Sequence, residues 1–152
     1  MYSATLLVHS WARWAVIIAG AIALARAISG ISGRKPWTRA DDRAGSWFTM
    51  SLDIQVLLGL ILYLFLSPFT PSSMSEFGAA MKASGPRFWA VEHTLGMIGG
   101  VALAHIGRAR SRRVDSFRRH KVAAIFFGLA LLLILASIPW PGTPNGRPWA
   151  RW

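Results

Sequence analysis

The chain has 152 residues, of which 53% are hydrophobic and 15% charged, and it carries a formal net charge of +11 with no cysteine. Apolar residues that fall in long blocks are typical of a membrane protein. The lack of cysteine excludes disulfides, thiolate metal sites and cysteine nucleophiles. Because the chain also lacks an HExxH motif, a phosphate-binding loop and a Ser/His/Asp arrangement, an enzyme of these classes is not expected.

Four stretches of mostly apolar residues are long enough, at about 18 residues or more, to cross roughly 30 Å of hydrocarbon. In chain order they cover about 4–29, 47–67, 86–106 and 122–138. Lipid offers no partner for a free backbone amide, and the alternating pattern of a membrane barrel is absent, so each stretch is predicted to be a helix. The sequence therefore predicts an all-α fold: a single transmembrane domain, 1–152, built as an antiparallel four-helix bundle. Segment 139–152 is rich in proline and glycine, which predicts an irregular tail lying on the outer membrane face.

Basic residues concentrate in the loops after the first and third predicted helices. Those two loops hold Arg34, Lys35, Arg39, Arg43, Arg108, Arg110, Arg112, Arg113, Arg118, Arg119 and Lys121, against only Lys82, Arg87, Arg147 and Arg151 on the other side. The positive-inside rule then predicts a multi-pass protein of the bacterial inner membrane with both termini, and the 68–85 loop, on the outer (periplasmic) side. Contact with anionic lipid accounts for the charge, so no nucleic-acid partner is expected.

Two histidines lie at similar depth in different helices. His9 is about five residues into the first helix and His93 about seven into the third, so both sit roughly 8–10 Å below the outer boundary at 1.5 Å per residue. Because cofactors are built in bundle cores from side chains on facing helices, the pair is predicted to be the axial ligands of a haem b.

Neighbouring residues fit this prediction. Arg13, four residues after His9, is a candidate partner for a haem propionate, and Glu92 adjoins His93. Met97, four residues after His93, keeps a His/Met ligation variant open. Gly96, Gly99 and Gly100 make space for either a flat macrocycle or a close neighbouring helix.

A cofactor-free interpretation of the same residues stays open. Arg13 and Glu92 form an ion pair in that interpretation, and His9 is an interfacial hydrogen-bonding residue. Toward the inner side, Arg26 and Asp53 are predicted to neutralise each other. His105 and His120 are not expected to hold a second haem, because His120 lies in "SFRRHKV", which reads as a solvated charge run.

Four motifs, "LLVHSWARW", "VEHTLGM", "SIPWP" and the terminal "RPWARW", carry a resemblance over nearly the whole chain. In their order and spacing the chain resembles a family of small bacterial four-helix membrane proteins often labelled cytochrome b. The resemblance implies that His9, Arg13, Glu92 and His93 are the characteristic polar set. Where relatives are expected to carry histidine before an Ile-Gln pair, this chain has Asp53, which argues against a ligand from the second helix.

These observations predict a small membrane-bound b-type cytochrome that carries electrons through a haem near the outer face and exchanges them with quinone. The alternative is a cofactor-free accessory subunit that packs against a larger respiratory or photosynthetic membrane complex. Either would be an electron-transfer protein or a subunit rather than an enzyme. A transporter is a weaker third interpretation, because no midplane polar site or broken helix is evident.

Overall fold

The computed structural model describes residues 1–67 and 74–151, so part of the predicted 68–85 loop and the last residue of the tail lie outside the described residues. Its elements are α1 (Tyr2–Ser32), α2 (Arg39–Ile61), η1 (Leu62–Leu66), α4 (Phe77–Lys82), α5 (Ser84–Arg87), η2 (Phe88–Glu92), α6 (His93–Ser111) and α7 (Ser116–Ser137). The two η elements are π-helical turns. They continue α2 and lead into α6, respectively. No strand occurs in the described part of the chain, which confirms that the fold is all-α.

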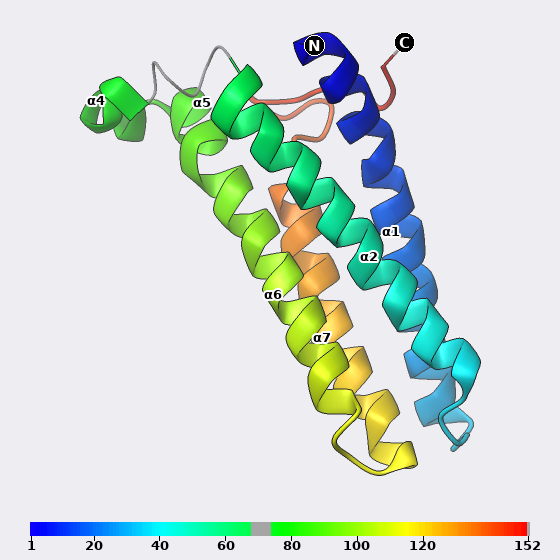
Figure 1. The fold of residues 1–152 in the computed structure, drawn as a ribbon. Coiled ribbons are helices and arrows are strands. Elements are labelled where there is room, and N and C mark those ends of the chain that lie inside the picture. The colour runs from blue at the N-terminus through cyan, green and yellow to red at the C-terminus, as the bar shows by residue number, and fades with distance from the viewer. Residues whose placement is uncertain (68–73, 152) are drawn as a thin grey trace.

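Four long helices lie side by side and alternate in direction (Figure 1). α1 packs against α2 and α7, and α6 packs against α7 and α2. Both chain ends, α4 and α5 lie at one end of the bundle, here called the termini end. The turns at 33–38 and 112–115 lie at the other, here called the hairpin end.

At the hairpin end, two helices begin earlier in the sequence than hydropathy predicted. α2 begins at Arg39 rather than 47, and α7 begins at Ser116 rather than 122. Both starts have N-terminal caps: Asp41 accepts the Thr38 backbone N–H, and Asp115 accepts that of Arg118. Capped polar turns extend a helix beyond the apolar window that a span search detects.

Three of these helices are long and apolar enough to cross a membrane: Tyr2–Ser32, Arg39–Leu66 and Ser116–Ser137. They indicate a multi-pass membrane protein. The fourth predicted span, around α6, is not among them, because histidines, glycines and the arginines near its end lower its hydropathy. α6 is held beside the three spans by packing against α7 and α2.

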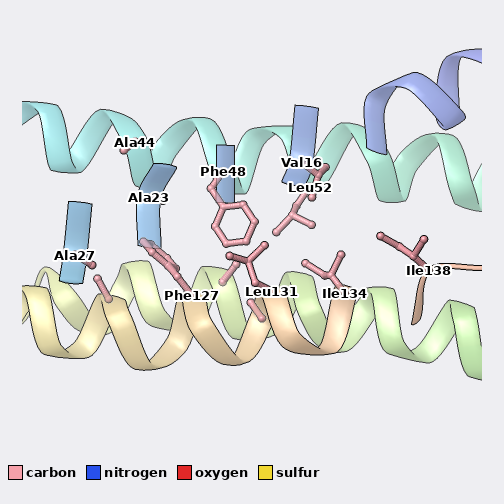
Figure 2. Close-up of a cluster of buried hydrophobic side chains, with 13 residues drawn as sticks. Val16, Ala23, Ala27, Ala44, Phe48, Leu52, Phe127, Leu131, Ile134 and Ile138 are labelled. Carbon is pink, nitrogen blue, oxygen red and sulfur yellow. The ribbon is translucent and has the colours of Figure 1, made fainter. Parts of the chain in front are cut away.

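The core fills the middle of the bundle (Figure 2). The rings of Phe48 and Phe127 meet edge to face with their centroids 5.5 Å apart, and Val16, Leu131 and Ile134 continue the core toward the termini end. Edge-to-face pairs are a favourable arrangement of buried aromatic rings. The bundle is therefore closed at its centre, and the cavity described below lies nearer the termini end.

Candidate functional site at the termini end

A cavity of about 150 Å³ lies between α1, α2 with η1, and α6, and the 138–151 segment covers part of it. Its walls are mostly apolar. The polar side chains that reach it include Tyr2, His9, Ser10, Arg13, Gln55, Tyr63, Ser67, His93, Thr94, Arg147 and Arg151. An apolar cavity with a few convergent polar groups is the usual form of a small-molecule or cofactor site.

The structure brings His9 of α1 and His93 of α6 together across this cavity. Their ring centroids are 6.5 Å apart and the ring planes are inclined by 74°. This is the pair whose proximity the sequence predicted from depth alone. The antiparallel packing of the bundle places both near the termini end, although 83 residues lie between them in the sequence.

His93 is held in one ring orientation and one tautomer. Its Nδ1 lies 2.8 Å from the backbone carbonyl oxygen of Ser137, at the last residue of α7. The final carbonyls of a helix have no partner within the helix, and an oxygen of this kind can only accept. Nδ1 therefore carries the proton, so Nε2 has a free lone pair. A second nitrogen bonded to a carbonyl is the usual support of a metal-ligating histidine.

His9 is supported from α2. The Gln55 amide nitrogen lies 3.1 Å from the His9 backbone oxygen and 3.3 Å from His9 Nε2. A Cβ at Gly59 would come within 3.2 Å of the His9 ring, so glycine leaves the ring room there. His9 Nδ1 is buried without a hydrogen-bond partner among the described residues. Because Nε2 accepts from the Gln55 amide N–H, Nδ1 carries the proton in this arrangement, so binding of a metal at Nδ1 requires the other tautomer of the ring.

Two histidines on facing helices are a ligand pair that a haem iron accepts. If their ligating nitrogens faced each other, two imidazoles that each bind one metal at about 2 Å would place their ring centroids roughly 6 Å apart, close to the observed 6.5 Å. The enclosed space is smaller than the roughly 300–1,000 Å³ of typical ligand pockets. Binding a macrocycle therefore requires lining side chains to move. Met97, which lines the cavity, is an unbranched side chain that can do so.

Three arginine side chains are candidate partners for the propionate groups of a haem. Arg13, Arg147 and Arg151 all line the cavity. Arg13 donates from Nη2 to the Trp149 carbonyl oxygen at 2.8 Å, while its Nε is buried without a partner among the described residues. Guanidinium groups at the edge of an apolar cavity are suited to binding carboxylates.

Glu92 does not reach the cavity. It forms an ion pair with Arg87, with Nε and Oε1 2.6 Å apart. The predicted Arg13–Glu92 pair is therefore not formed. Adjacent residues on a helix do not share a face, so Glu92 points away when His93 points inward.

The three glycines that follow His93 in α6 serve helix packing. A Cβ at Gly96 would overlap Ser137, and one at Gly99 or Gly100 would lie against Leu133 or Ile134 of α7. Of the two interpretations left open, the close neighbouring helix is therefore the one that the structure shows.

The charged pairs toward the hairpin end differ from those predicted. Arg26 pairs with Asp41 at 2.9 Å, whereas Asp53 pairs with His105 at 2.8 Å, so the predicted Arg26–Asp53 pair is wrong. The reason is the early start of α2, which adds an acidic first turn opposite the end of α1.

His120 is not solvated, contrary to its prediction. It is 2% exposed and packs beside Trp37, with ring centroids 4.9 Å apart, and against Gly30. The charged residues next to it in the sequence lie on other faces of α7, so their charge does not indicate whether His120 is exposed to solvent. His105 faces Asp53 instead, so His105 and His120 have different surroundings.

Sequence reasoning missed two residues of the site. Gln55, two residues after Asp53 in the sequence, contacts His9. Tyr63 lines the cavity and donates from its hydroxyl to the Ala90 carbonyl oxygen at 2.8 Å, which joins η1 to η2. π-Helical turns often occur at functional sites, but no pattern in the sequence predicted either turn.

Comparisons of the chain with protein-family models, with curated proteins and with solved structures found no match. The interpretation of this cavity therefore rests on its own residues.

Proposed function

We propose that the protein is a small membrane-bound b-type cytochrome that binds haem b between His9 and His93 and exchanges electrons with quinone. The observation that carries this proposal is the 6.5 Å separation of the two imidazole rings across an apolar cavity. Intramembrane ionisable residues are expensive and usually functional, which favours a role for this buried pair.

Each residue has a distinct part in this proposal. His9 and His93 supply the two nitrogen ligands. The Ser137 carbonyl oxygen and the Gln55 amide hold the two histidines by hydrogen bonds. Arg13 neutralises a cofactor carboxylate, and the apolar walls keep water away. When bound, haem supplies a one-electron couple at its iron, with the potential adjusted by ligands, hydrogen bonds and burial.

We further propose that α6 crosses the bilayer beside the three apolar helices, giving a four-helix inner-membrane bundle with both termini on the outer side. The basic residues near the hairpin end support this orientation through the positive-inside rule. In this arrangement the cavity lies near the outer face.

The first test is a reduced-minus-oxidised spectrum of the detergent-purified protein from haem-replete cells, with a pyridine haemochrome assay to count haem. We expect one haem b per chain. Replacing either proposed ligand, His9→Ala or His93→Ala, is expected to abolish the low-spin spectrum. His105→Ala is the matched control and should leave it intact, because His105 is paired with Asp53 outside the cavity.

Absence of haem from haem-replete cells would refute the proposal. A low-spin spectrum that survives His93→Ala would refute this ligand pair. Met97→Leu tests the His/Met variant: an unchanged spectrum is expected if His9 is the second ligand, and a lost methionine-ligated spectrum would assign the role to Met97.

The accessory subunit is the second candidate, and one observation favours it: the Asp53–His105 pair lies on the outer surface of the bundle. The proline-rich tail packs on α1 of its own chain. Trp14 stacks on Trp149 at 6.1 Å and donates to its carbonyl oxygen. Co-extraction with a larger complex in mild detergent, without haem, would put this candidate first.

A further inference from the structure

The pair formed by Asp53 of α2 and His105 of α6 lies on the outside of the bundle. His105 Nε2 and Asp53 Oδ1 are 2.8 Å apart, and the side chains are 46% and 53% exposed, respectively. Asp53 is the only charged residue between positions 47 and 66, well inside a helix apolar enough to span a membrane.

Apolar side chains surround this pair. Met50 and Leu57, three and four residues from Asp53 on the same face of α2, are 45% and 60% exposed, and Ile106 is 44% exposed. In a bilayer such a surface faces hydrocarbon. Ionisable residues within the membrane almost always face the protein interior or pair with one another, because lipid cannot solvate them. A half-exposed pair therefore indicates that another surface covers it.

When His105 is protonated, the pair has one donor and one acceptor left over. Within residues 1–67 and 74–151, the structure records no further side-chain hydrogen bond for either residue. A protonated His105 can donate from Nδ1, and Asp53 can accept at Oδ2. The unused groups are thus complementary to each other, so two copies of the pair can satisfy both.

α6 is shaped for close approach beside this pair. Ala102 and Ala109, on either side of His105 along the helix, are both exposed. Small residues let two membrane helices come near enough for polar side chains to bond across them. The same helix is less apolar than its three neighbours, which suits contact with protein better than contact with lipid.

We propose that this face, defined by Met50, Asp53, Leu57, Ala102, His105 and Ala109, is a two-fold interface between two copies of the chain. Each His105 donates to its own Asp53 and to Asp53 of the partner subunit, which closes a ring of four groups. A two-fold interface pairs one patch with itself, which is what one free donor and one free acceptor require. The proposal is independent of haem.

Cross-linking can test the interface directly, because the chain has no native cysteine. Single variants Met50→Cys, Leu57→Cys and Ala102→Cys are treated in native membranes with a short bis-maleimide. We expect a covalent dimer from these. Ile125→Cys and Leu132→Cys, on α7 and 59% and 66% exposed, are matched controls and should remain monomeric. Equal cross-linking on both faces, or cross-links only to a different protein, would overturn the proposal.

The polar pair is tested in the Leu57→Cys background. Asp53→Asn or His105→Gln is expected to reduce the dimer about tenfold, the size of a loss of one or two kcal/mol of interhelical hydrogen bonding. The exchanged variant Asp53→His with His105→Asp should restore it, since it keeps both pairings. Far-UV circular dichroism and elution in detergent report folding separately. Undiminished cross-linking in a folded Asp53→Asn variant would show that the pair does not hold the interface.

Discussion

At the scale of single residues, His120 shows how closely the hairpin end is packed. Its ring lies against the backbone at Gly30 of α1 and beside Trp37, and its exposure is 2%. Any side chain at position 30 would occupy the space of the ring. The glycine is therefore required by packing rather than by a turn.

Gly30→Ala is expected to destabilise the protein by about 1–3 kcal/mol, because the added methyl overpacks the contact with His120. The higher helix propensity of alanine offsets up to about 1 kcal/mol of this loss. The midpoint of thermal unfolding in detergent, followed by tryptophan fluorescence, measures the change. Gly128→Ala is the control: its Cβ would meet only Leu24, at 3.8 Å, so a neutral or slightly stabilising effect is expected. Equal midpoints for both variants would contradict the packing described here.

At the scale of elements, the start of α2 depends on Asp41. One carboxylate oxygen accepts from the Thr38 backbone N–H at 2.8 Å and from its hydroxyl at 2.6 Å, while the other accepts from Arg26 at 2.9 Å. Asp41 is 6% exposed. A single side chain thus caps one helix and ties it to the end of another, which explains why α2 extends beyond its apolar stretch.

Asp41→Ala is expected to cost about 1–2 kcal/mol, the usual range for a lost cap. Hydrogen exchange should show faster opening of the amides in the first two turns of α2. Asp42→Ala is the matched control, because the Asp42 side chain is half-buried and lies 3.9 Å from Arg112, and ion pairs in contact with solvent contribute about 0–1 kcal/mol. Exchange that is the same in both variants would show that Asp41 does not hold this end.

At the scale of the whole molecule, both termini lie at one end and the two tight helix connections at the other (Figure 1). The basic residues Arg34, Lys35, Arg112 and Arg113 belong to those connections or adjoin them. Sidedness follows from this asymmetry only through the positive-inside rule, so it needs its own test.

Ser3→Cys and Ser32→Cys provide that test, since both serines are exposed and lie at opposite ends of α1. An impermeant maleimide applied to intact spheroplasts is expected to label position 3 at once. Position 32 should react only after the membrane is permeabilised. The reverse pattern would invert the orientation, and labelling of both from outside would mean that α1 does not cross the membrane.

The sequence by itself determined the all-α class, the three apolar spans and the approximate depth of His9 and His93. Hydropathy and helix geometry are local properties, so a residue's height along its helix can be counted from the sequence. This is why two histidines far apart in the chain could be predicted to lie at one level.

Only the tertiary structure decided which side chains meet. The partners of Arg26, Asp53 and Glu92, and the burial of His120, depend on the rotation of each helix and on its register with its neighbours. Those are set by the packing of many side chains at once, including the close approach of His120 to Gly30 and of Ser137 to Gly96. No local pattern carries that information, because a change of one residue in helix length turns every later side chain by about 100°.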